Sequence, residues 1–372
     1  MDGHSAPSEI RVIAPCLGKR FSGINASMIA VLPELARHVP IAAVGFNLPA
    51  DVPQVRWGQL FGCARRGPWR IWHARRNVDM LVGLILRRVL GFKILLVFTS
   101  VAQRRHTWIT RFYVHRMDAL IAPTAAAASF LDRPAVIVSH GVNTQVFHPP
   151  ADRQAEWARR GLPGRYGIGV FGRLRPQKGT EDFIDAMVRV LPQRPDWTAV
   201  LVGQTTKEYH PFEQRLRRRL HEAGLADRVH FTGFLKDPND VPGWYRAMSV
   251  VVCPSRIEGF GLPCLEAMSC GCPVVATRTG AWPEVIRDGE DGYVVPCHDP
   301  DAMAAAILKV TADPSDANRM GHQAREKVTG RYRIEDEAAG ILDVYRRLFA
   351  KHFPLALGGH CSQNVASCNS LK

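Results

Sequence analysis

The chain has 372 residues, a length that accommodates about two domains of ordinary size. Hydrophobic residues make up 46% and charged residues 22%, which is typical of a globular α/β protein and excludes wholesale disorder, collagen and coiled coil. The net charge is +14, from 48 Lys and Arg against 34 Asp and Glu, and this excess calls for an anionic partner or a localised basic surface.

The first part of the chain alternates short apolar runs with helical patterns. Each run is rich in Val, Ile, Leu and Ala and is bounded by a turn signal or a helical stretch, as in buried strands of a parallel sheet covered on both faces. We expect strands at 10–15, 41–46, 94–98, 119–122 and 135–138. The sequence therefore predicts a doubly wound, Rossmann-like domain over residues 9–150.

A second series of apolar runs follows a segment that lacks strand character. That segment, 147–164, contains three prolines and is expected to be an interdomain linker. The strands expected after it are 166–171, 199–202, 229–232, 250–253, 273–276 and 293–295. They predict a second Rossmann-like domain over residues 163–332. Because ligands of such sheets sit at the carboxyl ends of the strands, the two domains should face each other across a cleft.

The C-terminal part of the chain carries one more helical pattern, at 334–349. We expect it to form a C-terminal helix, over residues 333–353, that closes the second domain. Residues 354–372 form a polar tail in this interpretation.

Most of the positive charge is concentrated between Arg65 and Arg116. This window holds twelve Lys and Arg and a single acid, Asp79, so it supplies +11 of the net charge. A solvated surface without a partner is the plain alternative. Nucleic acid, an acidic membrane surface and an anionic substrate are the candidate partners, and no nucleic-acid-binding motif accompanies the charge. We therefore expect a membrane surface or an anionic acceptor, and no nucleic acid.

Nothing in the sequence predicts a bilayer-spanning helix. The apolar run 80–86 is stopped by Arg87 and Arg88, far short of the roughly 20 residues that a spanning helix needs. Residues 1–9 are polar and give no sign of a signal peptide, and the nine cysteines show no paired CxxC spacing. We expect a cytoplasmic chain with reduced thiols that lies, at most, on the membrane surface.

Gly167, Gly169 and Gly172 form a literal Gly-x-Gly-x-x-Gly pattern. A nicotinamide-dinucleotide fingerprint is disfavoured, because the first two glycines fall within the predicted strand rather than in the turn after it. The loop that follows is more informative. It delivers Arg173 and Lys178 beside the N-terminus of a predicted helix, where a diphosphate could be held. Two solvated basic residues in a turn are the alternative.

Two carboxylates frame a glycine-rich loop after the predicted strand 250–253. Glu258 falls in this loop, and Glu266 is expected in the first turn of the helix that Pro263 opens. The carboxylates could accept hydrogen bonds from sugar hydroxyls while the backbone approaches phosphate. An ordinary tight turn and a helix-dipole glutamate are the plain alternatives. The candidate residues between the two carboxylates are Gly259, Phe260, Gly261 and Leu262.

Two further features have structural alternatives. Asp299-Pro300-Asp301 matches the Asp-x-Asp of metal-dependent sugar-nucleotide enzymes, but it precedes a helical pattern and is better explained as an N-cap with a first-turn acid. His106 follows the strand 94–98 inside the basic window. It is either a solvated loop histidine or a side chain that faces the cleft from the first domain.

The second half of the chain resembles the retaining glycosyltransferases of the large family 4 type, which includes glycogen and sucrose synthases and bacterial cell-envelope sugar transferases. The resemblance rests on Arg173 with Lys178, on the Glu258 and Glu266 pair, and on the segment 271–276 with Gly280 and Glu284; His140-Gly141-Val142-Asn143 also resembles the family's entry to the linker. It implies the GT-B fold, two tandem doubly wound Rossmann-like domains that face each other across a cleft.

The resemblance also implies residue roles. Arg173 and Lys178 would hold the donor diphosphate and stabilise the leaving nucleotide. Glu258, with the amides of residues 259–262, would bind the donor sugar and its phosphate, and Glu266 would bind the ribose. Transfer would retain the anomeric configuration without a metal ion or other cofactor, because the leaving phosphate can take the acceptor's proton.

The N-terminal domain is similar to the family more weakly. The family's glycine-rich first loop corresponds in this chain to Phe21-Ser22-Gly23-Ile24-Asn25, where Gly23 would let the backbone approach phosphate. Thr99-Ser100 stands where the family often has a histidine. His106 is the nearest candidate and would orient the donor sugar rather than act as a general base.

A narrower resemblance is to bacterial mannosyltransferases that build the lipopolysaccharide core. It rests on Thr99-Ser100, on 103–106 and on 116–124, and it implies GDP-mannose as donor and an anionic, lipid-linked acceptor. The alternatives are a UDP-sugar-dependent transferase of the same fold, a non-catalytic nucleotide-binding scaffold on the membrane, and, last, a nicotinamide oxidoreductase.

Overall fold

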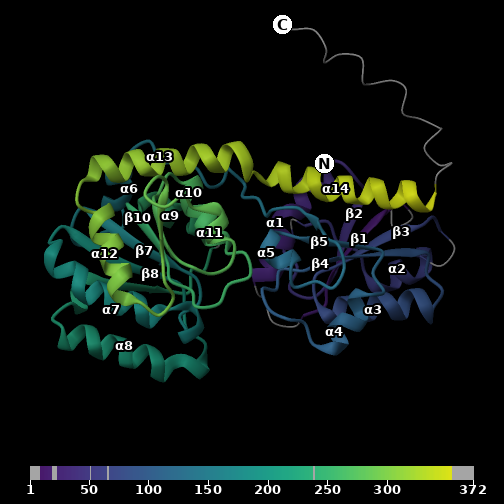
Figure 1. Cartoon of the computed structure of the whole chain (residues 1–372), viewed down its shortest axis with the longest axis horizontal. Helices are drawn as coiled ribbons and strands as arrows, with labels where there is room; N and C mark the ends of the chain where they lie inside the picture. The colour runs from purple at the N-terminus through teal and green to yellow at the C-terminus, as the bar shows by residue number, and fades with distance from the viewer. Residues whose placement is uncertain (1–8, 19–22, 51, 65–66, 238, 354–372) are drawn as a thin grey trace, which may run out of the picture.

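A computed structural model describes residues 9–18, 23–50, 52–64, 67–237 and 239–353. The predicted polar tail therefore lies outside the described residues, as do Phe21 and Ser22 of the first loop and Arg65 and Arg66 of the basic window. Two α/β domains lie side by side along the long axis of the molecule (Figure 1). The prediction of tandem doubly wound domains is confirmed.

The N-terminal domain is built on a parallel sheet in the order β2-β1-β3-β4-β5-β6. Its strands are β1 (Val12–Cys16), β2 (Ile41–Gly45), β3 (Arg70–Ala74), β4 (Ile94–Thr99), β5 (Ala119–Ala122) and β6 (Val136–Ile137). Its helices are α1 (Gly23–Ala36), α2 (Trp57–Ala64), α3 (Asn77–Arg88), α4 (Trp108–Val114) and α5 (Ala125–Ala128). The chain direction across the sheet reverses between β1 and β3, which is the switch point of this domain.

The C-terminal domain has a parallel sheet in the order β12-β11-β10-β7-β8-β9. Its strands are β7 (Tyr166–Phe171), β8 (Trp197–Val202), β9 (Val229–Gly233), β10 (Val250–Cys253), β11 (Val274–Thr277) and β12 (Gly292–Val295). Its helices are α6 (Arg153–Ala158), α7 (Thr180–Val190), α8 (His210–Glu222), α9 (Asp240–Ala247), α10 (Leu262–Ser269), α11 (Trp282–Val285), α12 (Pro300–Val310) and α13 (Pro314–Arg331). Short 3₁₀ turns occur at 176–178, 191–193, 207–209 and 226–228. This strand order is that of dinucleotide-binding Rossmann folds, with the switch point between β7 and β10.

Strand β3 was not expected from the sequence. It begins with the buried Arg70 and carries the buried His73 near its end, so no continuous apolar run marks the strand. The Arg70 guanidinium donates hydrogen bonds to the carbonyls of Ile10 (2.8 Å) and Pro68 (3.1 Å). His73 lies between Tyr345 Oη and Thr99 Oγ1, each 2.6 Å from one of its ring nitrogens. Internal partners therefore let charged and polar side chains occupy a central strand.

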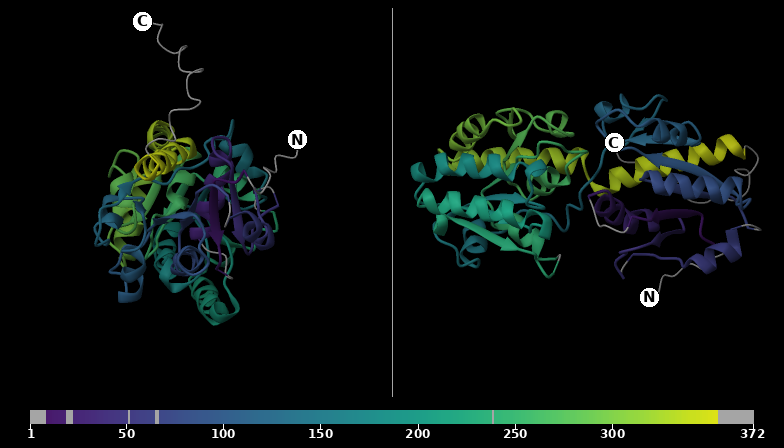
Figure 2. Two further views of the ribbon diagram at one scale, coloured as in Figure 1. Left: turned by 90° about the vertical axis from the view of Figure 1, so that its right-hand side faces the viewer. Right: turned by 90° about the horizontal axis from the view of Figure 1, so that it is seen from below.

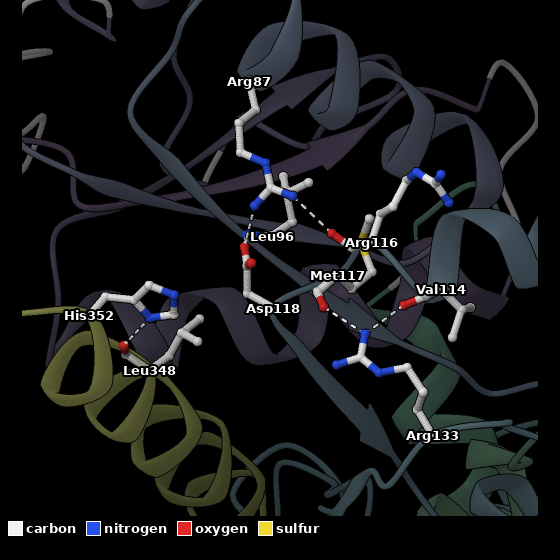
Figure 3. Close-up of polar contacts among 9 residues, drawn as sticks. All are labelled: Arg87, Leu96, Val114, Arg116, Met117, Asp118, Arg133, Leu348 and His352. Atoms are coloured by element: carbon white, nitrogen blue, oxygen red, sulfur yellow. Dashed lines mark hydrogen bonds and ion pairs between the residues drawn. The ribbon is translucent and has the colours of Figure 1, made fainter.

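Part of the basic window is engaged inside the N-terminal domain rather than available to a partner. Arg70 and Arg75 are buried. Arg87 forms an ion pair with Asp118 (2.5 Å) and donates to the carbonyl of Arg116 (2.9 Å), which ties α3 to the segment that precedes β5 (Figure 3). The predicted basic surface is consequently smaller than the charge count indicated.

The last helix, α14 (Ile334–His352), packs on the first domain and not on the second. Its buried face, which includes Ile341 and Tyr345, joins the core formed by β1, β3, β4 and α1. Figure 1 and Figure 2 show α13 and α14 nearly end to end along one side of both domains. The expectation that this helix closes the second domain is wrong, because helical periodicity identifies an apolar face without identifying its partner.

The predicted linker also contains a helix of the second domain. Asp152 caps α6 by accepting hydrogen bonds from the amides of Gln154 and Ala155, and Trp157 is buried in the core of the C-terminal domain. Arg153 donates to the carbonyls of Arg246, Met248, Cys270 and Gly271. Within the predicted linker, only the part before α6 connects the domains.

The chain crosses between the domains twice, and the two crossings pair with each other. The amide of Val142 donates to Tyr332 O (2.9 Å), and the amide of Ile334 donates to Val142 O (3.0 Å). Beside them, Glu337 accepts from the amide of Gly141 (2.8 Å) and lies 2.8 Å from the buried His140 ring. The connection is thus a short, hydrogen-bonded double strand.

Candidate active site

The loop after β7 delivers two cations to the switch point of the C-terminal sheet. Gly172 follows the strand, Arg173 is exposed, and a short 3₁₀ turn ends at Lys178. Gly179 then adopts a left-handed backbone with φ of 64° and precedes the first residue of α7. Both cations lie near the N-terminal end of α7, a position that favours anionic groups.

The loop after β10 brings Glu258 against Lys178. Glu258 Oε2 lies 2.5 Å from Lys178 Nζ, and both side chains are largely buried. Ser255 Oγ donates to the same carboxylate oxygen (3.4 Å), and the amide of Gly259 donates to Oε1 (3.2 Å). The carboxylate is therefore held in one orientation beside the ammonium.

The two loops are fastened to each other and to the sheet. The amide of Arg256 donates to Gln177 O (3.0 Å), and its guanidinium forms two hydrogen bonds with Asp182 at the start of α7 (2.9 and 2.5 Å). From β11, Thr277 Oγ1 donates to Ser255 O (2.5 Å). These contacts preorganise the loops before any ligand binds.

A pocket opens between these loops, and it contains Arg173, Lys178 and Glu258 together. Its lining residues are Val170, Phe171, Gly172, Arg173, Leu174, Lys178, Thr180, Cys253, Pro254, Ser255, Glu258, Pro263 and Trp282. Sequence reasoning missed Trp282, whose ring donates to Gly261 O (3.1 Å) and packs where a Cβ on Gly261 would lie. Trp282 lies 21 residues beyond Gly261 in the chain, and no local pattern links it to the loop.

Glu266 does not line this pocket. It lies one turn further into α10 than expected: Pro263 is in the first turn, and the first turn holds no acid. The half-buried Glu266 carboxylate accepts a hydrogen bond from Tyr245 Oη (2.7 Å). Tyr245 in turn stacks on Phe171 at the end of β7, with ring centroids 3.6 Å apart. Burial raises the pKa of Glu266 to about 7, although the hydrogen bond from Tyr245 opposes this rise.

The loop after β4 meets the loop after β10 from the opposite domain. An ideal Cβ on Gly259 would lie 2.9 Å from Val101 O, so a side chain there would collide with this loop. The same loop holds His106, half-buried, with Nε2 3.2 Å from Ser100 Oγ. Burial lowers the pKa of His106, which favours the neutral form of its ring. Gly23 is the first residue of α1, and the space where its Cβ would lie is open.

Gly179 provides a test of the contact between the two loops. A Cβ there would lie 1.8 Å from Pro254 O, whereas Gly161 has nearly the same backbone, with φ of 63°, and open space around it. Gly179→Ala is expected to lower the free energy of unfolding by about 2–4 kcal/mol and Gly161→Ala by about 1 kcal/mol. Urea unfolding of both variants measures the difference. Equal losses would mean that the backbone angle alone, and not the contact with Pro254, demands glycine at position 179.

Asp299 is confirmed as a helix cap. It accepts from the amide of Ala302 (2.8 Å) at the start of α12, and Asp301 pairs with Arg189 (2.5 Å). Within the described ranges, no three His, Cys, Asp or Glu side chains gather as metal ligands would. None of the helices that the structure describes is long and apolar enough to cross a membrane.

Two Rossmann-type domains joined by a double crossing, with an Arg, Lys and Glu pocket at the switch point of the second sheet, define a glycosyltransferase of the GT-B type. The chain belongs to the glycosyl transferases group 1 family, whose sequence model matches residues 134–327. The resemblance noted in the sequence is thereby confirmed.

Curated relatives match nearly the whole chain. The lipopolysaccharide core biosynthesis mannosyltransferase LpcC of Rhizobium leguminosarum bv. viciae is 42% identical over 344 residues, which are 91% of this chain and 97% of the relative. The lipopolysaccharide core biosynthesis mannosyltransferase LpsB of Rhizobium meliloti is 40% identical over 347 residues, covering 91% and 98%.

Solved structures agree at the level of the fold. The C-terminal domain of LpcC from Francisella tularensis, a glycosyl transferase group 1 family protein, is 44% identical and covers 52% of this chain and 100% of its own, with a TM-score of 0.51. HepE of Anabaena, solved in complex with UDP, is 19% identical and covers 91% and 100%, with a TM-score of 0.79. The latter shows the likeness of both domains together.

Proposed function

We propose that this glycosyltransferase moves mannose from GDP-mannose to an anionic, lipid-linked acceptor of the lipopolysaccharide core type. The observation that carries the proposal is the 40–42% identity, over nearly the full length, to two transferases named for that activity. The pocket at the end of β7 supports it, because two cations and a carboxylate suit a sugar diphosphate.

The pocket residues have distinct tasks in this proposal. Arg173 and Lys178 bind the diphosphate and stabilise the charge that builds on it as the glycosidic bond breaks. Glu258, held by Lys178 and Ser255, accepts hydrogen bonds from hydroxyls of the sugar. Glu266 accepts hydrogen bonds from the ribose hydroxyls. His106 orients the sugar from the first domain.

Transfer proceeds with retention of configuration. The acceptor oxygen attacks the anomeric carbon from the face on which the bond to phosphate breaks, and the acceptor's proton passes to a phosphate oxygen of the leaving GDP. No protein base takes the proton. No metal ion or other cofactor is needed in this proposal, because Arg173, Lys178 and the N-terminal end of α7 supply the positive charge.

The acceptor is bound by the first domain, and the cleft closes during turnover. Because a lipid-linked acceptor stays in the membrane, the enzyme works as a peripheral protein on the cytoplasmic face of the inner membrane. Basic residues of the 65–116 window contact that surface.

Thermal unfolding with GDP, UDP, ADP, NADH and their sugar derivatives tests the donor. A nucleotide at about 100 times its dissociation constant stabilises the fold by roughly 2.7 kcal/mol, so GDP and GDP-mannose alone should raise Tm. A rise with UDP compounds instead would replace the donor and keep the enzyme class. Transfer of labelled mannose, with the anomeric configuration read by NMR, completes the test, and an inverted product would refute retention.

A further inference from the structure

Helices α3 and α4 together present an apolar surface to solvent. We call it the α3–α4 face and define it by Leu81, Ile85, Val89, Trp108, Ile109 and Phe112, each at least 39% exposed. Trp108 is 77% exposed and Val89 is 73% exposed, values that are unusual for such large apolar side chains. The two helices lie together on the side of the first domain opposite α14 (Figure 1).

The arrangement is a consequence of helical spacing. Along α3, Met80 and Leu84 point into the core, while Leu81 and Ile85, four residues apart, share the outer face. Trp108 and Phe112 repeat the same spacing on α4. A helix that is apolar on both its inner and outer faces is covered by something beyond its own domain.

Charge around this face is predominantly positive: the acids that pair with its helices, Asp118 with Arg87 and Asp132 with Arg111, are each matched by an arginine. Between Asn77 and Arg116 the only acid is Asp79, and it is buried. Arg88, Lys93, Arg104 and Arg105 are exposed, and each lies within four residues of a member of the face along the chain. The guanidinium of Arg116 lies over the Phe112 ring, 3.4 Å from its centroid. These cations of the basic window remain at the surface of the domain, where they complement an anionic surface.

The face also reaches the loop that carries His106. Helix α3 starts beyond the carboxyl end of β3, and α4 starts directly after the loop that carries His106. A hydrogen bond from Asn77 to Thr110 Oγ1 (2.7 Å) joins the N-terminal ends of the two helices there. Trp108 is therefore two residues from a side chain of the candidate active site.

We infer that the α3–α4 face docks on the surface of an anionic phospholipid bilayer, with Trp108 and Phe112 inserted at the level of the headgroups and the exposed cations contacting anionic lipid. Tryptophan prefers that interface, and apolar insertion with a basic margin is the usual signature of a monotopic surface. The inference refines the membrane contact of the proposed function: it rests on that function for the acceptor's location, and its test does not require turnover.

Co-sedimentation of the full chain with lipid vesicles tests the face. We expect binding to vesicles of phosphatidylethanolamine and phosphatidylglycerol and little binding to phosphatidylcholine alone. The double variant Trp108→Ser/Phe112→Ser should lower the partition coefficient by about tenfold or more, and Arg88→Glu/Lys93→Glu by about tenfold on the anionic vesicles.

Two matched variants control for the loss of exposed apolar area and for charge. Phe234 is 67% exposed on the other domain, so Phe234→Ser should bind as the wild type does. Arg346 and Arg347 are exposed on α14, on the opposite side, and Arg346→Glu/Arg347→Glu should also bind. Far-ultraviolet circular dichroism and Tm confirm that each variant is folded.

Three results would overturn the inference. The first is a wild-type chain that does not bind anionic vesicles, and the second is undiminished binding by Trp108→Ser/Phe112→Ser. The third is a dimer, seen by analytical ultracentrifugation, that this variant dissociates, because the face would then be an interface between two copies. A failed GDP-mannose assay with vesicle binding intact would refute the proposed donor and leave the docking surface standing.

Discussion

Replacing Lys178 or Arg173 with alanine is expected to lower kcat for sugar transfer by about 10²–10³-fold each. The two cations line one pocket at the N-terminal end of α7, where negative charge builds on the leaving diphosphate. Their contribution is larger in the transition state than in the donor complex, so kcat should fall rather than the donor KM alone rise. Steady-state kinetics with saturating acceptor measures the two parameters separately.

The control for this pair lies at the other end of the same strand. Arg165 immediately precedes β7, is exposed and approaches the Tyr166 ring, while Arg173 follows the strand's carboxyl end. Arg165→Ala should leave kcat unchanged, since only the carboxyl end faces the pocket. If Lys178→Ala and Arg173→Ala raised the donor KM with an unchanged kcat, the cations would bind the donor without stabilising the leaving group.

The hydrogen-bonded crossing between the domains lies directly against the loop after β10. The His140 ring, paired with Glu337, makes an edge-to-face contact with Phe260, with ring centroids 5.0 Å apart. A second link joins the amide of Ala126 in α5 to Glu284 Oε1 (3.4 Å). In the proposed reaction, closure of the cleft would act on the same loop that holds Glu258 and would couple acceptor binding in one domain to the donor site in the other.

The parts of the fold that the sequence predicts are those encoded by local pattern. Strand β10 of the second domain is a continuous apolar run, and strand β5 has the predicted bounds, 119–122. The loops at the switch point are also local: each follows a strand and ends in a helix. For that reason Arg173, Lys178 and Glu258 could be assigned to one pocket before their distances were known.

The missed features depend on contacts that are remote in the sequence. Strand β3 escapes detection because partners up to 272 residues away satisfy its polar side chains, as Tyr345 does for His73. Helix α14 has an apolar face that either domain could have covered. The charge of the basic window can be counted from the sequence, but the partition between buried, paired and exposed cations is set only by the tertiary fold.

We expect Glu266 to give the transfer reaction an acid limb in its pH profile. Its pKa is raised to about 7 by burial, so the carboxyl group is mostly neutral below that pH. A neutral carboxyl group cannot accept hydrogen bonds from two ribose hydroxyls with both oxygens, and donor binding should weaken. We expect kcat/KM for the donor to be level above pH 7 and to fall by about tenfold per pH unit below it, because this ratio reports the ionisation of the free enzyme.

Two variants identify the group responsible for the limb. Glu266→Gln should lower kcat/KM at pH 8 and remove the acid limb, since the amide does not titrate. The hydroxyl of Tyr245 donates to Glu266 Oε2 and lowers the pKa of Glu266. Tyr245→Phe removes this hydroxyl, so the midpoint of the acid limb should move to higher pH. The pKa of Asp79 is also raised, to about 6, by burial at the switch point of the first sheet. An acid limb that persists in Glu266→Gln would therefore mean that another carboxylate titrates, and it would contradict the ribose role of Glu266.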